Sequence, residues 1–284
     1  MLFETKDWRD PRIHSFGNQG VWGGLHAGIA PFFTWMLDKS AYGGVNVREA
    51  TAFQLAFQHR HQGLPTRKIL DLGCGTGPMT RAMALAFEND GAEVLGVDTS
   101  KEMLAMAELA TTLSNLKRKY SMLIGRRREL LSINNADNYW TGADESDNCN
   151  GPVKASFFVA NAEDTGLDAN SFDIVCATFF LHEAPSVGRN AIMSEARRCL
   201  KPGGTFLVLD IAREYQPSPV MKSGEPYIEG YLKNIESEIS TAGFEEIKCY
   251  QPIKGRAEVW VATEPICKKI RLKDMKRSEK SSRM

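Results

Sequence analysis

Between Arg67 and Ala212 the sequence alternates short apolar runs rich in β-formers with longer amphipathic runs, and this alternation constrains the fold most. The expected strands are KILDL, AEVLGVD, ASFFVA, FDIVCATFF and GTFLVLD. The expected helices between them are PMTRAMALAFEN, SKEMLAMAELATTLSNLKRKY and VGRNAIMSEARRCL. Strands that are apolar throughout belong in a parallel sheet covered on both faces. Right-handed crossovers then predict an α/β protein with a doubly wound, mostly parallel sheet.

Other segments flank or interrupt this alternation. Residues 1–65 carry apolar side chains at roughly helical spacing and are expected to form an N-terminal helical cap or lid. The main domain is expected over 66–264, with a polar, Asn- and Asp-rich passage at 121–155 that is either a surface insertion or a partner-binding loop. The basic tail at 265–284 indicates a solvated disordered end, with a nuclear-import or anionic-surface role as the alternative.

Composition limits the partners. Lys plus Arg and Asp plus Glu balance at 35 each, so no global field attracts nucleic acid or an anionic membrane. The six cysteines are scattered without a CxxC pair or a Cys/His cluster, which predicts no metal site and a reducing compartment. The N-terminus lacks the apolar region of a secretory signal, and no run approaches the ~20 apolar residues of a membrane span. The expectation is a soluble, cytoplasmic protein.

The stretch ILDLGCGTG, residues 69–77, marks the candidate ligand site. In a doubly wound sheet, ligands bind beyond the carboxyl ends of the strands, and the first strand–helix turn is such a place. Here that turn carries Gly73, Gly75 and Gly77. The dinucleotide fingerprint would require a glycine at Pro78, and a phosphate P-loop would require a lysine after Gly77.

Two acids narrow the choice of ligand. Asp71, just before the glycine loop, would repel a pyrophosphate but could pair with a cationic amino group. Asp98 ends the second expected strand, where a carboxylate accepts hydrogen bonds from ribose hydroxyls. Acids on both sides of a bare-backbone turn suit a ligand with an amino acid at one end and a nucleoside at the other. S-adenosylmethionine has this structure.

The sequence resembles the class I S-adenosylmethionine-dependent methyltransferases of the small-molecule, type 11 kind. The matching motifs are ILDLGCGTG, VLGVDTSKEMLAMA, ANAEDTGLDANSFDIVCATFFLHEAP and EARRCLKPGGTFLVLD, in the family's order. The match is close over 67–212 and looser to about Thr263. It implies a seven-stranded Rossmann-like sheet with an antiparallel C-terminal strand, and S-adenosylmethionine as cofactor.

The resemblance also implies which residues contact the cofactor. They are Asp71, Gly73, Cys74, Gly75, Gly77, Asp98, Thr99, Met103, Asn161, Ala162 and Thr178. Asp98 would hold the ribose, with Thr99 beside the adenine. Asn161 stands where the family usually has aspartate, and its side-chain oxygen would meet the adenine amino group. Thr178 would face the methionine end.

Catalytic and acceptor-binding residues are expected around this cofactor site. His182 and Glu183 follow the fourth expected strand, and the near-neutral pKa of a histidine suits a general base if the acceptor must lose a proton. The alternative is that His182 packs against the cofactor or caps the next helix. The side chains expected to cover a small, partly apolar acceptor, with core packing as the alternative for each, are Trp22, His26, Phe33, Trp35, Tyr227 and Tyr231.

Competing functions make different demands on the sequence. A nicotinamide-dependent short-chain reductase needs a Tyr-x-x-x-Lys pair on a helix, and Tyr250 to Lys254 has this spacing but contains Pro252. A non-catalytic module would bind cofactor without turnover. A lipophilic quinone precursor as acceptor would favour Arg-Asn where this chain has His182-Glu183. The sequence therefore predicts methyl transfer to a small molecule.

Overall fold

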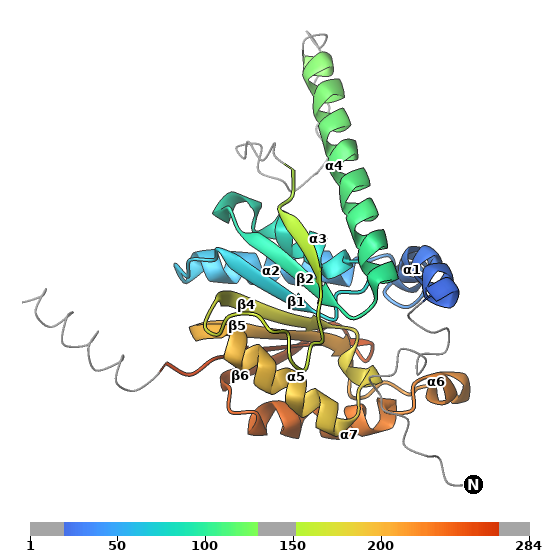
Figure 1. Ribbon diagram of the computed structural model, residues 1–284, viewed down its shortest axis with the longest axis vertical. Coiled ribbons are helices and arrows are strands. Elements are labelled where there is room, and N and C mark those ends of the chain that lie inside the picture. Colours follow the sequence, from blue (N-terminus) through green and yellow to red (C-terminus); the bar gives the residue numbers. More distant parts are fainter. Residues whose placement is uncertain (1–19, 130–151, 267–284) are drawn as a thin grey trace, which may run out of the picture.

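The computed structural model of the chain describes residues 20–129 and 152–266, which form one seven-stranded sheet with helices on both faces (Figure 1). The strand order is β3-β2-β1-β4-β5-β7-β6. The strands are β1 (Lys68–Leu72), β2 (Glu93–Asp98), β3 (Ala155–Val159), β4 (Phe172–Thr178), β5 (Leu200–Ile211), β6 (Glu245–Ile253) and β7 (Ala257–Thr263). β1 to β5 pair in parallel, whereas β7 runs antiparallel to β5 and to β6. The predicted doubly wound sheet with an antiparallel C-terminal end is confirmed.

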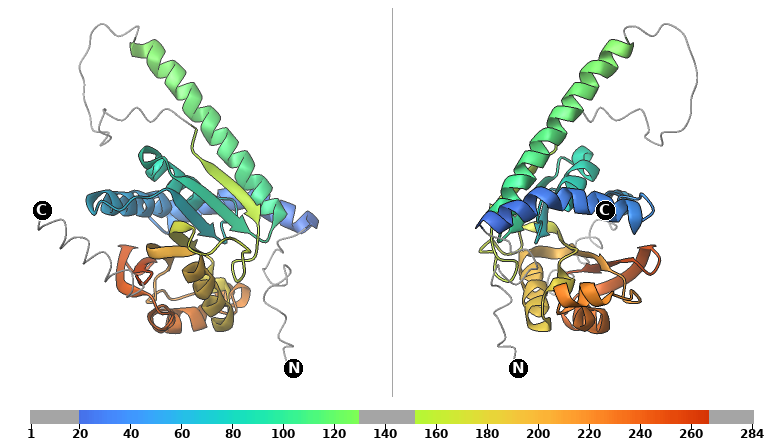
Figure 2. Two further views of the ribbon diagram at one scale, coloured as in Figure 1. Left: turned by 60° about the vertical axis from the view of Figure 1, so that its left-hand side comes forward. Right: turned by 90° about the vertical axis from the view of Figure 1, so that its right-hand side faces the viewer.

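Seven α-helices lie in the described residues, and some of them cover the two faces of the sheet (Figure 2). They are α1 (Gly20–Ser40), α2 (Val47–His61), α3 (Pro78–Ala86), α4 (Lys101–Glu129), α5 (Ser186–Cys199), α6 (Pro219–Gly224) and α7 (Ile228–Thr241), with 3₁₀ turns η1 (Glu88–Asp90) and η2 (Leu181–Glu183). α2 begins after Asn46, whose side-chain oxygen accepts a hydrogen bond from the Glu49 backbone. α3 begins with Pro78, which fits the first position of a helix because its missing N–H needs no partner there.

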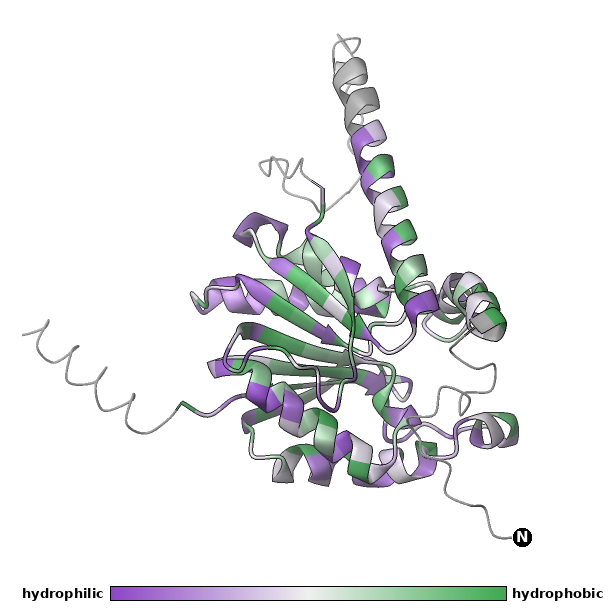
Figure 3. Ribbon diagram, in the orientation of Figure 1, coloured by the Kyte–Doolittle hydropathy of each residue, from purple (hydrophilic) through white to green (hydrophobic). Residues whose placement is uncertain are grey.

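The strands are apolar throughout because the sheet is covered on both faces. On β1, Ile69 belongs to the core shared with α2 and α3, while the next residue, Leu70, belongs to the core shared with α5 and α7. Ile174 and Val175 on β4 divide in the same way. Figure 3 shows these central strands as a hydrophobic layer. Each face therefore needs an apolar side chain at every second position, which leaves no polar alternation.

The chain order reverses between β1 and β4, which are neighbours in the sheet. From β1 the chain continues to strands on one side, and from β4 to strands on the other. The carboxyl ends of the parallel strands meet at one edge, and the loops after β1 and β4 diverge there. This edge is where a doubly wound sheet opens a ligand-binding crevice.

Several predictions on domain organisation fall partly outside the described residues. α4 continues to Glu129, so the first part of the predicted 121–155 insertion is helical, and the helix projects away from the sheet in Figure 1. Residues 1–19, 130–151 and 267–284, which include most of the predicted basic tail, lie outside the described ranges. The boundaries of cap, main domain and tail remain predictions. Within 20–129 and 152–266, no helix combines the length and apolar character of a membrane span.

Candidate functional site

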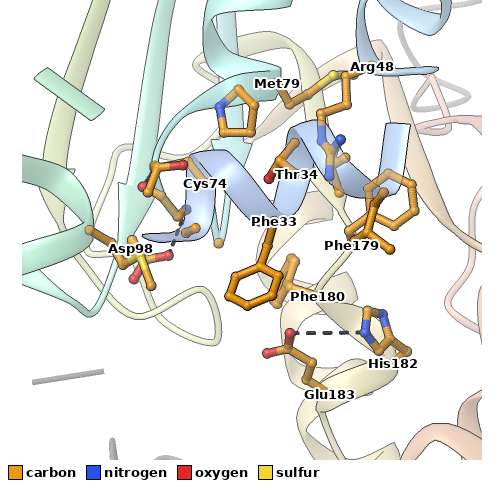
Figure 4. Close-up of a pocket in the computed structure, with 18 of the residues that line it drawn as sticks. Phe33, Thr34, Arg48, Cys74, Met79, Asp98, Phe179, Phe180, His182 and Glu183 are labelled. Atoms are coloured by element: carbon orange, nitrogen blue, oxygen red, sulfur yellow. Dashed lines mark hydrogen bonds and ion pairs between the residues drawn. The ribbon is translucent and has the colours of Figure 1, made fainter. Parts of the chain in front are cut away.

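A cavity of about 600 Å³ lies at the carboxyl edge of the sheet, with α1 on its other side (Figure 4). This volume is typical of small-molecule sites. Most of the predicted site residues line it, although they come from distant parts of the chain. They are His26, Phe33, Asp71, Gly73, Cys74, Gly75, Asp98, Thr99, Met103, Asn161, Ala162, Thr178, His182 and Glu183.

Five predicted residues are not among those that line the cavity. Gly77 precedes α3, where an added Cβ would lie 2.8 Å from the Phe157 ring, so its role here is close packing. Tyr231 is fully buried, because α7 turns it into the core, where its ring centroid lies 6.2 Å from that of His182. Tyr227 sits at the start of α7 and does not line the cavity. The side chain of Trp22 lies outside the described residues, and Trp35 is 56% exposed.

The glycine loop has the conformation that its sequence demands. Gly73, Gly75 and Gly77 have φ angles of 62°, 53° and 73°, in the left-handed region that favours glycine. At Gly73 an added Cβ would also lie 2.8 Å from the Phe180 ring. The loop therefore brings bare backbone against both the cavity and the aromatic side chain that follows β4.

The carboxylate of Asp98 is fixed by the backbone on both of its oxygens. Oδ2 accepts a hydrogen bond from the Gly75 N–H at 2.9 Å, and Oδ1 accepts one from Ser100 N–H, also at 2.9 Å. These bonds hold the carboxylate in one orientation at the wall of the cavity. This arrangement links the ends of β1 and β2 and suits a diol such as ribose.

Asp71 lies beneath the glycine loop and acts on the cavity mainly through its charge. It has no exposed surface, and its carboxylate accepts hydrogen bonds from Thr80 Oγ1 at 2.6 Å and from Cys176 Sγ at 3.5 Å. Burial raises the pKa of Asp71 to about 6, although the bonds from Thr80 and Cys176 oppose this shift. A cationic group above the loop would stabilise the ionised form.

Asn161 and Thr178 offer polar atoms to a ligand in different ways. Asn161 Oδ1 accepts a hydrogen bond from the Glu163 backbone at 3.0 Å, which fixes its amide and leaves one lone pair. Thr178 Oγ1 is buried and has no hydrogen-bond partner among the residues described. A buried hydroxyl without a partner costs free energy, so its position at the cavity fits a partner supplied by a ligand.

His182 and Glu183, in η2, form a charged pair at the other end of the cavity. His182 Nδ1 lies 2.6 Å from Asp210 Oδ1, and Nε2 lies 4.0 Å from the Glu183 carboxylate (Figure 4). Burial disfavours the imidazolium, but the carboxylates of Asp210, Glu183 and Glu225 outweigh burial and raise the pKa of His182 to about 9. Burial also raises the pKa of Glu183 to about 7. At neutral pH His182 therefore carries its proton, and Glu183 is the group that titrates near neutrality.

The structure adds cavity residues that the sequence did not reveal. The Arg48 guanidinium lies 4.5 Å above the Phe179 ring, and Tyr42 stacks on the same ring at a centroid distance of 6.1 Å. Phe179 has a φ of 52°, which is rare for a bulky residue and often marks a functional site. The other unpredicted lining residues include Phe180, Tyr215, Met221, Glu225 and Arg256. No local sequence pattern marks these positions, because they meet only through tertiary packing.

Three metal-compatible groups also face the cavity. A ring nitrogen of His182 and carboxylate oxygens of Glu183 and Glu225 lie within 4.8 Å of one another. The sequence predicted no metal site, and this remains a prediction. The charge of His182 at neutral pH gives these groups another role, as partners of an imidazolium.

Comparison with known proteins agrees with this geometry. Residues 70–208 match a family model described as a methyltransferase domain. The chain is 29% identical over 153 residues to demethylmenaquinone methyltransferase of Symbiobacterium thermophilum, covering 53% of this chain and 45% of that protein. The chain therefore spans less than half the length of this curated relative.

Two solved structures share the fold. The CurJ carbon methyltransferase aligns with a TM-score of 0.57 at 14% identity, over 85% of this chain and 61% of the other. Phosphoethanolamine N-methyltransferase 2 of Haemonchus contortus, in complex with S-adenosyl-L-methionine, aligns with a TM-score of 0.53 at 18% identity, over 89% and 60%.

The strand order and the cavity at the reversal of that order define a Rossmann-like α/β domain, with the fold of the two solved structures above. More narrowly, the match over residues 70–208 identifies this part of the chain as a methyltransferase domain.

Proposed function

We propose that this protein transfers a methyl group from S-adenosylmethionine to a small-molecule acceptor bound in the same cavity. The observation that carries the proposal is the Asp98 carboxylate, which the Gly75 and Ser100 backbone fixes at the joined ends of β1 and β2. A positioned carboxylate beside a bare-backbone loop fits an adenosyl ligand whose other end is an amino acid. The Haemonchus contortus protein, which has the same fold, binds this compound.

The charges around the cavity support a cationic cofactor. Asp71 and Asp98 lie at the glycine loop, and Glu183 and Glu225 line the opposite part. When bound, S-adenosylmethionine supplies a methyl group on a positively charged sulfur. The ammonium and sulfonium groups of that compound would meet carboxylates at both ends. Carboxylates repel a pyrophosphate, so the same set of charges disfavours a nicotinamide dinucleotide.

The protein's contribution to the reaction is alignment and proton handling. Holding two reactants in line can lower a barrier by roughly 7–11 kcal/mol, and the cavity walls also exclude water. Where the acceptor must lose a proton, Glu183 Oε is the better receiver at neutral pH, because its pKa is raised to about 7 while His182 is already protonated. His182, held by Asp210, donates a hydrogen bond and stabilises negative charge that develops on the acceptor.

The acceptor side of the cavity is largely aromatic. Phe33 from α1, Phe180 after β4 and Tyr215 after β5 line it together with the Phe179–Tyr42 stack. Apolar ring faces suit a planar or partly apolar acceptor. The named quinone-pathway relative makes a lipophilic quinone precursor the second candidate acceptor. We also infer an enzyme that does not use nucleic acid, since basic and acidic residues balance at 35 each. The six scattered cysteines support a reducing, cytoplasmic setting.

Incubation with methyl-labelled S-adenosylmethionine and separate aqueous and lipid metabolite extracts tests the proposal, with mass analysis of labelled products. A labelled product from the aqueous extract supports a soluble acceptor, and one from the lipid extract supports the quinone-type alternative. Cofactor binding without any labelled product would indicate a non-catalytic module and contradict the proposed transfer.

A further inference from the structure

Arg48 stands out among the cavity residues because its charge is poorly compensated within the described part of the chain. Its side chain is only 11% exposed and lines the cavity. Its ion pair is with Asp38 Oδ1, at 3.6 Å, which is too long for a hydrogen bond. That Asp38 oxygen is itself buried without a hydrogen-bond partner among the described residues. Within the same ranges, the guanidinium makes no hydrogen bond.

The position of the guanidinium is fixed before any ligand binds. It lies 4.5 Å over the Phe179 ring, which stacks on the ring of Tyr42 and packs against the core. Phe179 is held in its unusual backbone conformation by a hydrogen bond from its N–H to the Leu209 carbonyl at 2.8 Å. Arg48 itself lies in the first turn of α2, which the Asn46 cap orients. A group held this firmly binds a ligand at little cost in side-chain entropy.

The physical cost of this arrangement points to an anionic ligand. A guanidinium removed from water needs charged or hydrogen-bonding partners, and a long ion pair supplies only part of them. Burial lowers the pKa of Arg48, while the charges of Asp38, Tyr42, Asp71 and Asp210 act against that shift. Asp71 is on β1, beneath the glycine loop, and Asp210 contacts His182 at the other end of the cavity. The charge of Arg48 is therefore felt at both ends of the cavity.

We propose that Arg48 forms a carboxylate-binding subsite of this cavity, with its planar donor fork pairing with both oxygens of the ligand. Arginine is suited to this task because its donors match a carboxylate in a bidentate geometry. Two compounds could supply the carboxylate. The first is the cofactor, through its amino-acid end, and this source rests on the proposed function. The second source is the acceptor. The two sources share one chemistry and differ in which compound loses affinity when Arg48 is replaced.

Calorimetry on the full chain separates these sources. Wild type, Arg48→Gln, Arg48→Lys and the matched control Arg60→Gln are titrated with S-adenosylhomocysteine and with its decarboxylated analogue. Arg60 lies on the same helix but pairs with Asp90 at 2.8 Å, away from the cavity. Thermal melts of each variant show whether it is folded.

If the cofactor supplies the carboxylate, wild type binds the decarboxylated analogue roughly tenfold or more weakly, the loss expected for a charged hydrogen-bonded pair. Arg48→Gln then binds both compounds with equal, reduced affinity, Arg48→Lys falls between, and Arg60→Gln behaves as wild type. If the acceptor supplies it, Arg48→Gln binds both adenosyl compounds like wild type. Benzoate, titrated against benzyl alcohol in the presence of S-adenosylhomocysteine, then binds wild type and loses roughly tenfold in Arg48→Gln.

Equal affinities of wild type for the two adenosyl compounds, together with no preference for benzoate, would overturn the subsite. If wild type binds neither adenosyl compound, the proposed function fails. In that case benzoate is titrated into the free protein. Weaker binding to Arg48→Gln than to wild type supports the subsite, and equal binding overturns it.

Discussion

His182 and Asp210 are 28 positions apart in the sequence, and a contact of 2.6 Å joins Nδ1 of the histidine to Oδ1 of the aspartate. The contact forms because β4 and β5 are neighbours in the sheet and end at the same edge, one just before His182 and the other beside Asp210. The Ile211 N–H also donates to Asp210 Oδ1, at 2.7 Å. The histidine is therefore held in one orientation, with its second nitrogen directed toward Glu183.

Asp210→Asn tests the electrostatic part of this relationship. Removing the negative charge should lower the pKa of His182 from about 9 by roughly one unit or more, since an opposite charge at this distance has effects of that size. NMR titration of the imidazole C–H resonances measures the shift. A wild-type His182 that titrates at its ordinary value, unchanged by Asp210→Asn, would contradict the account.

The same pairing predicts how stability depends on pH. The pKa of His182 is higher in the folded protein, about 9, than the ordinary 6.5, so folding favours the protonated form. This stabilisation is complete below about pH 6.5 and is lost as pH rises through about 9. Urea unfolding of wild type should show a larger loss of stability across this window than Asp210→Asn does. Parallel curves for the two proteins would argue against the pairing.

His182→Ala and Glu183→Gln test the proton-handling part of the site. Both should retain near-normal affinity for S-adenosylhomocysteine and, for an acceptor that loses a proton, should lower turnover by roughly 10²- to 10⁴-fold. Single-turnover transfer of labelled methyl, with cofactor affinity measured separately, distinguishes the two effects. Turnover equal to wild type in either variant would remove that residue from the mechanism.

Gly73→Ala tests the glycine loop. The new Cβ would adopt a φ of 62° and lie 2.8 Å from the Phe180 ring, so the change should shift that ring and weaken cofactor binding. The matched control is Gly63→Ala, at a φ of 67° with nothing within 4 Å, which carries only the roughly 1–2 kcal/mol cost of left-handed backbone. Unfolding and cofactor titration should show Gly73→Ala as the more damaging change. Equal losses of stability in the two variants, with unchanged affinity for the cofactor, would contradict a role of Gly73 in cofactor binding.

A buried ion pair between α5 and α7 supports η2, which packs on the same face of the sheet. Arg189, 1% exposed, donates to both carboxylate oxygens of Glu238, at 2.6 and 2.8 Å, and to the Ala184 carbonyl at 2.5 Å. Glu238→Ala leaves the guanidinium buried without its partner and should destabilise the fold by roughly 3–5 kcal/mol. Urea unfolding measures this loss. A cost as small as that of an exposed pair such as Lys222 with Glu229 would show that the pair does not brace η2.

Local pattern was sufficient for the parts of the site that strands and turns define. The ends of β1 and β2 place Asp71 and Asp98, and the glycine spacing places Gly73, because strand period and backbone requirements are written in consecutive residues. Arg48 and Phe179 were not found, because their contact joins the cap to the loop after β4.

The need for tertiary contacts also explains why the burial of Tyr231 and the charge of His182 do not follow from the sequence. Tyr231 was predicted at the acceptor, but α7 turns its apolar face, with this side chain, into the core against His182. The pairing of His182 with Asp210 depends on which strands are neighbours, and sequence alone does not fix that order. Residue types at a strand end can thus be read locally, whereas their charge states need the assembled sheet.

Calorimetric titration of the purified protein with S-adenosylhomocysteine, beside Asp98→Ala, tests the central claim most directly. Asp98→Ala removes a carboxylate that two backbone N–H groups hold at 2.9 Å, where our proposal puts the ribose. We therefore expect wild type to bind and the variant to lose roughly tenfold or more in affinity. A wild-type protein that gives no heat of binding, or a variant that binds as tightly as wild type, would contradict the assignment of this cavity to the cofactor.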